Sequence, residues 1–145
     1  MLISGASTGI GRHAAIGLAK ANHEFTVFAG VRKETDFNAI IDERLPNLRP
    51  ILLDVTSYSS CVDVIEKMSQ EITTSQKPLI ALVNNAGISR NIPIELHHMD
   101  DVRLLFETNF FGMLQLTQLA MPLLRSSAGR IIMISSVAGF IGHCY

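Results

Sequence analysis

The first residues whose types and spacing could do chemistry lie in the stretch 2–11, which contains Gly5, Gly9 and Gly11. A short apolar run precedes the glycines, and a helical pattern of apolar residues follows them. Glycine allows a positive φ and lets a ligand approach without a Cβ in the way. The following helix would offer free N–H groups and positive dipole charge to a phosphate. The stretch therefore predicts a pyrophosphate cradle, and its alternative is a plain structural turn.

The spacing of these glycines narrows the class of nucleotide site. It is Gly-x-x-x-Gly-x-Gly, whereas many dinucleotide-binding folds have Gly-x-Gly-x-x-Gly. The stretch also lacks the Gly-Lys-Ser/Thr ending of a P-loop. ATP hydrolysis is therefore not expected.

A pair of asparagines, Asn84 and Asn85, forms the second candidate group and is followed by Ala86 and Gly87. The pair comes directly after the apolar run 79–83, which predicts a buried strand. Buried amides are costly unless they are hydrogen-bonded. We therefore expect these side chains to bond neighbouring strands and a ligand.

Two further candidates are serines after a strand and one asparagine in a helix. Ser135 and Ser136 follow the apolar run 130–134, and parallel sheets place their chemistry at the carboxyl ends of strands. Asn109 is the polar member of an otherwise apolar helical stripe. Such an asparagine often only satisfies nearby backbone groups, so from the residues alone that alternative stays open.

The elements that must position these residues alternate between apolar runs of strand length and amphipathic helical patterns. This alternation predicts a parallel sheet with right-handed crossovers. We expect strands just before Gly5 and over 25–29, 50–53, 79–83 and 130–134, and helices over 11–21, 36–44, 57–74 and 99–124. The apolar stripes of three helices are predicted to comprise Ile10, Ala14, Leu18 and Ala21; Tyr58, Cys61, Val62, Ile65, Met68 and Ile72; and Val102, Phe106, Asn109, Phe110, Met113, Leu116, Ala120 and Leu124.

The end of the second strand indicates which cofactor is preferred. In nucleotide-binding sheets this position faces the adenosine ribose, where an acid would accept from a 2′-hydroxyl and a base would pair with a 2′-phosphate. The chain offers no acid at this junction and has Arg32 and Lys33 there. NADP(H) is therefore favoured over NAD(H), which stays the alternative. A solvating role for these two charges is the other interpretation.

The glycine stretch and the Asn84-Asn85-Ala86-Gly87 motif together resemble the short-chain dehydrogenase/reductase family. The family signatures are TGxxxGIG, here with Ser4 in place of the threonine, and NNAG. The resemblance covers the whole chain and implies one Rossmann-type α/β domain over residues 1–145. Its parallel sheet would have strand order 3-2-1-4-5 with helices on both faces, incomplete at the C-terminal side.

The resemblance also implies which residues contact the cofactor. Asp54 and Val55 would flank the adenine ring, with helix capping as the alternative role for Asp54. The NNAG residues would brace the sheet and lie beside the nicotinamide ribose. The full set of expected cofactor-binding residues is Gly5, Ser7, Thr8, Gly9, Ile10, Gly11, Arg32, Asp54, Val55, Asn85, Ala86 and Gly87.

For catalysis, the resemblance implies roles for Asn109 and Ser136. Asn109 would hold a water in a proton relay, and Ser136 would hydrogen-bond the substrate oxygen, with Ser135 structural. The family also uses a Tyr-x-x-x-Lys pair, in which the lysine lowers the high pKa of the tyrosine. The tyrosine is expected about a dozen residues beyond the serine. Tyr145 is only nine beyond it and the last lysine is Lys77, so neither is assigned to the pair.

We therefore expect this chain to be the N-terminal, cofactor-binding part of a longer dehydrogenase, with residues also missing before Met1. Few residues precede the glycine stretch, which is short for a central strand. The fifth strand would form an apolar edge without its helical cover.

Composition limits the partners that are expected. The chain has 145 residues, 48% hydrophobic and 17% charged, with a formal net charge of −1, which describes one ordered domain without an electrostatic case for nucleic acid. No apolar run approaches a membrane span and no signal peptide is evident, so we expect a cytoplasmic protein. Cys61 and Cys144 are expected as reduced thiols, with Cys61 in a helix core. The adjacent His97 and His98 do not have metal-site spacing, so no metal is expected.

The favoured function is an NAD(P)(H)-dependent oxidoreductase that interconverts an alcohol and a carbonyl. The segment Phe-Ala-Gly-Val-Arg resembles steroid and retinol dehydrogenase branches, which implies an apolar small-molecule substrate. The family resemblance also implies a homo-oligomer through the long helix around Asn109. One alternative is a non-catalytic dinucleotide-binding short form or partner subunit that lacks the Tyr/Lys pair. Another is a nucleotide-sugar epimerase relative, against which NNAG and the GxxxGIG ending argue.

Overall fold

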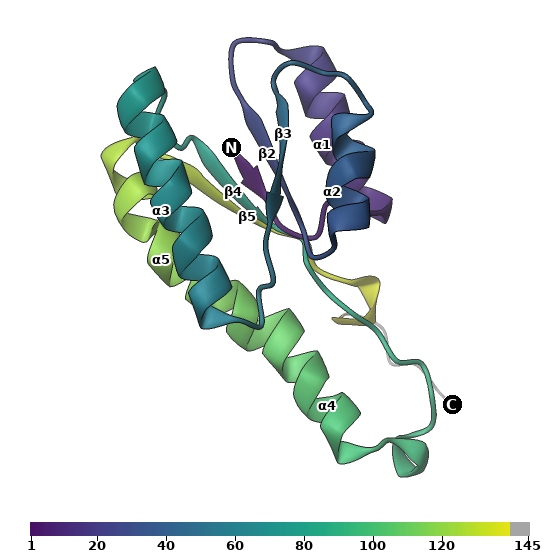
Figure 1. The fold of residues 1–145 in the computed structure, drawn as a ribbon. Coiled ribbons are helices and arrows are strands. Elements are labelled where there is room, and N and C mark those ends of the chain that lie inside the picture. Colours follow the sequence, from purple (N-terminus) through teal and green to yellow (C-terminus); the bar gives the residue numbers. More distant parts are fainter. Residues whose placement is uncertain (140–145) are drawn as a thin grey trace.

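The computed structural model describes residues 1–139 of the 145-residue chain. Strands alternate with helices along it (Figure 1). The strands are β1 (Leu2–Ile3), β2 (Val27–Val31), β3 (Leu48–Leu52), β4 (Ala81–Asn84) and β5 (Arg130–Met133). The helices are α1 (Gly9–Ala21), α2 (Glu34–Ile41), α3 (Tyr58–Ser75), α4 (Met99–Phe106) and α5 (Met113–Ser126), with a π-helical segment (Glu107–Gly112) and 3₁₀ turns (Ile94–Leu96 and Val137–Gly139).

All five strands form one parallel sheet in the order β3-β2-β1-β4-β5, which confirms the predicted topology. The short β1 lies at the centre, where Leu2 is in register with both Phe28 and Leu82. Parallel neighbours require crossovers, and the helices between the strands supply them. The sheet therefore brings the loops after β1, β2, β3, β4 and β5 to one edge.

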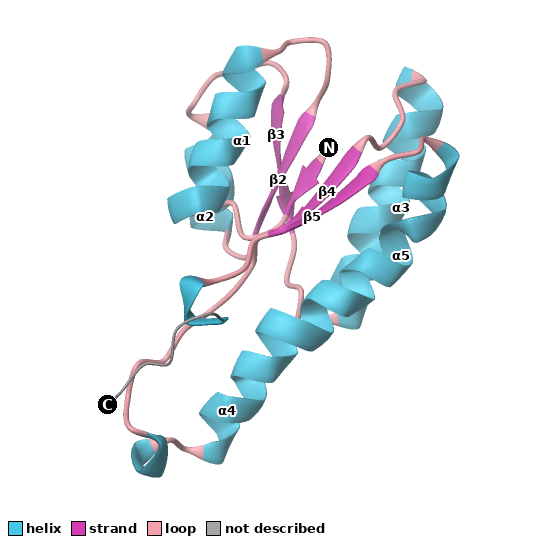
Figure 2. Cartoon of the chain, turned by 180° about the vertical axis from the view of Figure 1, so that it is seen from behind, coloured by secondary structure: helices cyan, strands magenta, loops and turns pink. Residues whose placement is uncertain are grey.

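Helices cover both faces of this sheet, with α1 and α2 on one side and α3 and α5 on the other (Figures 1 and 2). Alternate residues of a strand point to opposite faces. Leu2 accordingly packs in the core against α3 and α5, whereas Ile3 packs in the core against α1 and α2. These two cores hold the strand ends, and hence the loops after them, in fixed positions.

The predicted apolar face of α1 is displaced, whereas that of α3 is largely right. On α1 the buried residues are Gly11, Ala15 and Ala19, one position later than predicted, and Ile10 is 66% exposed. The small residues face the sheet because α1 packs closely against it. On α3 the prediction that Cys61 is in the core is confirmed, but Tyr58 is 62% exposed because it begins the helix at the rim of the sheet.

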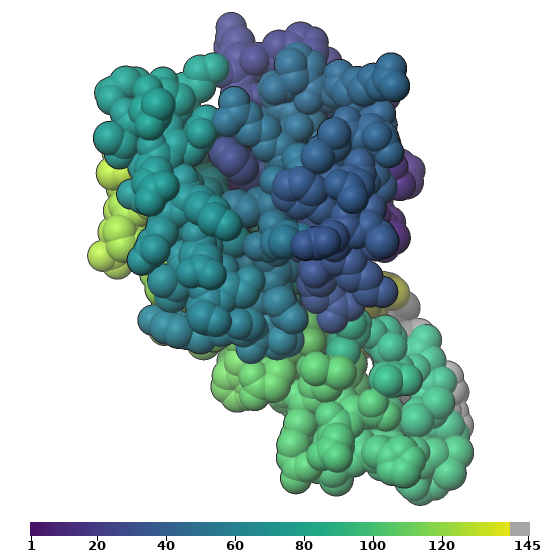
Figure 3. Space-filling view, viewed as in Figure 1, coloured from purple at the N-terminus to yellow at the C-terminus, as the bar shows by residue number. Residues whose placement is uncertain are grey.

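The predicted single helix over 99–124 is instead three helical segments, α4, the π-helical segment and α5. Its buried residues are Thr108, Gly112, Leu116, Ala120 and Leu124, at steps of four. The predicted stripe is right for the last three and wrong for Phe106, Asn109 and Phe110, which are exposed. For Phe106 the reason is that α4 projects past the sheet as a separate lobe, so its apolar residues meet no strand (Figures 1 and 3).

Among residues 1–139, no helix has both the length and the apolar content needed to cross a bilayer.

Candidate active site

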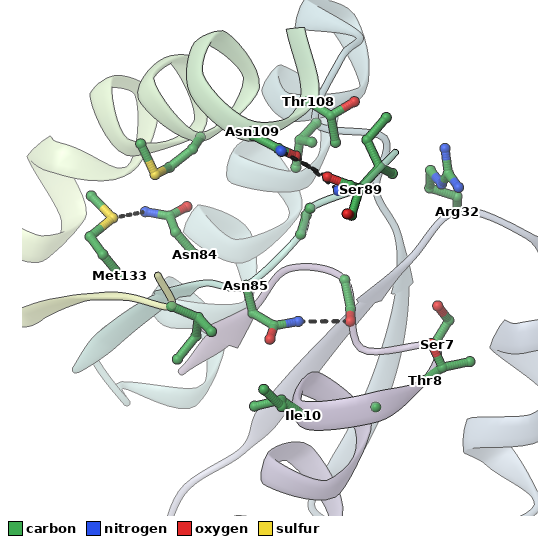
Figure 4. Close-up of a pocket in the computed structure, with 18 of the residues that line it drawn as sticks. Ser7, Thr8, Ile10, Arg32, Asn84, Asn85, Ser89, Thr108, Asn109 and Met133 are labelled. Carbon is green, nitrogen blue, oxygen red and sulfur yellow. Dashed lines mark hydrogen bonds between the residues drawn. The ribbon is translucent and has the colours of Figure 1, made fainter. Parts of the chain in front are cut away.

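A cleft of about 980 Å³ lies at the carboxyl edge of the sheet. Its lining comes from the loops after all five strands and from the π-helical segment and α5. Figure 4 shows Ser7, Thr8 and Ile10 on one side, with Thr108 and Asn109 across from them. The cleft is lined by Gly5, Ser7, Thr8, Gly9, Ile10, Arg32, Leu53, Asp54, Val55, Asn84, Asn85, Ala86, Gly87, Ile88, Ser89, Thr108, Asn109, Met113, Met133, Ile134, Ser135 and Ser136.

The glycine turn between β1 and α1 has the geometry of a phosphate cradle. Gly5 and Gly9 have φ values of 65° and 56°, which L side chains rarely adopt. A Cβ on Gly9 would meet nothing within 4 Å, so this turn has open space beside it. Thr8 precedes α1 without making a side-chain cap, and the first turn of the helix carries no acid. The N–H groups at this helix end are therefore suited to a pyrophosphate.

Gly11 has a different role, because it does not line the cleft. It is buried, and a Cβ there would overlap Asn85 Nδ2 and the Gly5 carbonyl oxygen. Asn85 Nδ2 donates to the carbonyl oxygens of Ser4 (3.0 Å) and Gly5 (2.9 Å). Gly11 thus allows α1 and the loop after β4 to pack together beneath the cradle.

Ser4 completes this link and was not predicted as a site residue. It is 1% exposed, and its hydroxyl oxygen accepts from the backbone N–H groups of Asn85 (3.0 Å) and Ala86 (3.1 Å). The hydroxyl lies 3.4 Å from the Val83 carbonyl oxygen, to which it donates. The signal in the sequence was its position in the glycine motif, where the family has threonine. We call these bonds between Ser4, Gly5, Asn85 and Ala86 the central clasp.

Arg32 follows β2 at the rim of the cleft and is exposed. The register of Val31 with Leu52 places it beside the loop after β3. Lys33 does not line the cleft and stands at the N-terminal cap of α2. Of the two predicted basic residues, the structure brings only Arg32 to the site.

The loop after β3 contributes Asp54 and Val55. The Asp54 carboxylate accepts from the backbone N–H (2.9 Å) and the hydroxyl (2.7 Å) of Thr56. Helix α3 is capped by Ser57, which accepts from the Ser60 N–H at 3.3 Å. The alternative role for Asp54, helix capping, is therefore wrong: its side chain closes the turn before the helix, and the turn lines the cleft.

Asn84, the first asparagine of the pair, is 4% exposed and bonds neighbouring elements as expected for a buried amide. Its Nδ2 donates to Thr117 Oγ1 on α5 at 2.9 Å and lies 3.4 Å from Met133 Sδ on β5 (Figure 4). The two asparagines therefore bond different neighbours: Asn84 links β4 to α5 and β5, and Asn85 links it to β1 and the loop after it.

Asn109 lies in the π-helical segment and is exposed rather than on a buried face. Its Oδ1 accepts from the Ile88 N–H and its Nδ2 donates to the Ile88 carbonyl oxygen, both at 2.8 Å. This pair of bonds fixes the loop after β4 against the helix. The amide therefore orders one wall of the cleft, beside Gly87.

Ser135 and Ser136 both line the cleft after β5, on the side of Met133 and Ile134. The Ser136 hydroxyl accepts from the Ala138 N–H at 3.2 Å and is exposed. The structure thus brings Asn109 and Ser136, predicted from distant parts of the sequence, to one cleft. Tyr145 lies outside the described residues. Ser89, Thr108, Met113, Met133 and Ile134 also line the site and had no signal beyond their place next to predicted residues.

Comparison with known proteins identifies the class that this fold and cleft define. Residues 1–144 match the family model for the short chain dehydrogenase. The chain is 39% identical over 147 residues to 3-amino-tetrahydro-pyrrolizinone reductase of Xenorhabdus hominickii, covering all of this chain and 48% of that protein. It is 36% identical over 148 residues to mouse estradiol 17-beta-dehydrogenase 2, covering 97% of this chain and 37% of that protein.

A solved structure, NADPH-bound carbonyl reductase from chicken fatty liver, superposes with a TM-score of 0.85 at 29% identity. The match covers 95% of this chain and 59% of that one. The chain belongs to the short-chain dehydrogenase family. It spans about half the length, or less, of the curated relatives described above.

Proposed function

We propose that the protein is an NADP(H)-preferring oxidoreductase that interconverts an alcohol and a carbonyl. The observation that carries the proposal is the single cleft joining a phosphate cradle at Gly5–Gly9 to Ser136 and Asn109. Bound NADP(H) would supply or accept the hydride. The cradle would hold its pyrophosphate, and the Ser136 hydroxyl would donate a hydrogen bond to the substrate oxygen and so orient its carbon.

Arg32 supports the preference for the 2′-phosphorylated cofactor. Arg32 is a basic side chain of the cleft, beside the loop after β3. Asp54 is the acidic residue among the lining residues near it. The Asp54 carboxylate is already engaged by Thr56. A guanidinium pairs well with a phosphate in two-point geometry.

The preference is tested by Arg32→Asp in the complete gene product, with Arg44→Asp at an exposed position in the turn after α2 as the matched charge change. We expect Arg32→Asp to weaken NADPH binding by about 10- to 100-fold. NADH binding should change by less than about threefold, because it has no 2′-phosphate. Equal NADPH affinity in the variant would mean that Arg32 does not contact the phosphate.

An apolar substrate is the second part of the proposal. The reaction end of the cleft is lined by Met113, Met133 and Ile134 beside the two serines. One relative is named for estradiol, a steroid, and the other is named for 3-amino-tetrahydro-pyrrolizinone. We infer a hydroxyl or ketone on an apolar ring or chain.

Direct hydride transfer tests the reaction itself. The complete gene product would be incubated with NADPH that carries deuterium at both C4 positions and with a panel of steroid and retinoid ketones and aldehydes. We expect deuterium on the carbinol carbon of the product alcohol, detected by mass spectrometry. Cofactor binding without any labelled product across the panel would favour the alternative hypothesis of a non-catalytic dinucleotide-binding protein.

We also propose a homo-oligomer that forms through the α4–α5 segment. The support is the row of exposed apolar side chains there, in which Phe106 is 59%, Phe110 49% and Leu114 43% exposed. Exposed patches of this kind mark association surfaces. Sedimentation of the complete gene product should give a multiple of the monomer mass, and Phe110→Asp should reduce it to one.

We propose that the protein is cytoplasmic. The free thiol of Cys61 is compatible with a reducing compartment. Fractionation of the source cells with an antibody to the chain tests this location, and recovery in a membrane or organelle fraction would contradict it.

A further inference from the structure

The side chain of Gln115 links α5 to the loop after β3. Its Nε2 donates to the Val55 carbonyl oxygen and lies 3.8 Å from Cys61 Sγ. Gln115 is half-buried on α5 and does not line the cleft, whereas Val55 does. The Gln115 amide therefore holds Val55, which lines the cleft, from outside the cleft.

Gly112, one turn earlier, brings the same helix against the same carbonyl group. A Cβ on Gly112 would lie 2.6 Å from the Val55 carbonyl oxygen and 2.9 Å from its carbon. Contacts this short require either the Gly112 backbone or the Val55 backbone to move, because a Cβ is fixed to the former and the contacted atoms belong to the latter. The absence of a side chain at Gly112 is thus what lets the Val55 peptide sit against the helix.

The other contacts of this turn come from α3, which directly follows it. Ser60 Oγ accepts a hydrogen bond from the Asp54 backbone N–H at 3.0 Å. The Cys61 thiol lies 3.8 Å from the carbonyl oxygens of Asp54 and Val55. Burial raises the pKa of Cys61 to about 11, so the group stays a neutral, weak donor. Gln115 is therefore the strong donor to the Val55 carbonyl among the described contacts.

The loop after β3, with Asp54 and Val55, lines the cleft together with Arg32 and with residues of the π-helical segment and α5. On the helix, Thr108 and Met113 line the cleft, while Gly112 and Gln115 face Val55. We propose that Gln115 and Gly112 are positioning residues that set the place of the Val55 wall and thereby the affinity for the adenosine half of the cofactor. This inference rests on the proposed cofactor function.

The first test is Gln115→Leu in the complete gene product, with Gln70→Leu as control because Gln70 is exposed on α3, away from the α4–α5 segment. Binding of NADPH and of adenosine 2′,5′-bisphosphate, which lacks the nicotinamide half, is measured by calorimetry. We expect both dissociation constants to rise by about tenfold in Gln115→Leu. Gln70→Leu should leave both within about twofold of the unaltered protein.

A purely structural role would lower the melting temperature of Gln115→Leu and leave both dissociation constants unchanged, which would overturn the inference. Weaker binding of NADPH with unchanged binding of adenosine 2′,5′-bisphosphate would also overturn the inference, because the effect would then lie at the nicotinamide half. Failure of the unaltered protein to bind either NADPH or NADH would instead refute the proposed function.

The second test is Gly112→Ala, with Gly17→Ala as control. A Cβ on Gly17 would meet nothing within 4 Å. We expect Gly112→Ala to weaken adenosine 2′,5′-bisphosphate binding at least as much as Gln115→Leu, about tenfold or more. Unchanged affinity in Gly112→Ala would show that the place of the Val55 peptide does not govern the adenosine half.

Discussion

The two ends of the cleft are built in different ways. Beneath the glycine turn, buried polar groups are bonded to one another: Ser4 is 1% exposed and is bonded to Asn85 and Ala86. At the reaction end, Ser135 and Ser136 are exposed and Met133 is 48% exposed. Within residues 1–139 the difference follows the sheet, in which β1 is central and β5 is at the edge. The described contacts thus fix the glycine turn from several sides and hold the serines after β5 by fewer bonds.

Ser136→Ala should separate the two ends most clearly. We expect turnover to fall by about 10²- to 10³-fold, because the hydroxyl that we propose to orient the substrate oxygen is lost. NADPH affinity and the free energy of unfolding should stay nearly unchanged, because the described contact of the Ser136 hydroxyl is one hydrogen bond from the Ala138 N–H. Steady-state kinetics and calorimetry check this, with Ser126→Ala on exposed α5 surface as control. Full turnover in Ser136→Ala would remove the serine from the mechanism.

Gly11→Ala should have the largest effect on stability. The added Cβ would overlap Asn85 Nδ2 and the Gly5 carbonyl oxygen, so the central clasp would have to open. We expect the free energy of unfolding to fall by about 3 kcal/mol, with loss of cofactor binding. Urea denaturation followed by circular dichroism measures it. A variant as stable as the parent would show that the clasp is not tightly packed.

Ser4→Ala should cost less, since the backbone stays in place. Two buried N–H groups lose their acceptor, and we expect a loss of about 2 kcal/mol in the free energy of unfolding. Ser4→Thr keeps the hydroxyl and should recover most of that loss. The same denaturation experiment compares them, and equal stability of the alanine and threonine variants would contradict the role given to the hydroxyl.

Gly17→Ala should have the smallest effect and the opposite sign. Gly17 is exposed in the middle of α1, with open space where a Cβ would lie. Alanine should raise the free energy of unfolding by about 0.5 to 1 kcal/mol, because it restricts the unfolded chain and favours the helix. If Gly17→Ala lost as much unfolding free energy as Gly11→Ala, the close packing at Gly11 would not be the reason for the effect there.

The sequence was enough to predict what depends on local pattern. Glycine spacing, the NNAG motif and alternating apolar runs led to the confirmed sheet order and family. These signals work because positive φ, strand burial and helix periodicity each constrain residue type directly. The same reasoning placed Cys61 in the core.

What the sequence could not predict depends on contacts between distant elements. The stripe through Phe106 and Phe110 has helical spacing, yet both side chains are exposed, one on α4 and the other on the π-helical segment after it. Periodicity states which residues share a face and not whether a partner covers it. Gln115 and Ser4 gave no strong signal, because their roles rest on meeting Val55 and Asn85 in space.

Side-by-side titration of the complete gene product with NADPH and NADH tests the central claim most directly. The cradle and Arg32 predict that NADPH binds at least about tenfold more tightly than NADH. Tighter binding of NADH, or binding of neither cofactor, would contradict the account of this cleft.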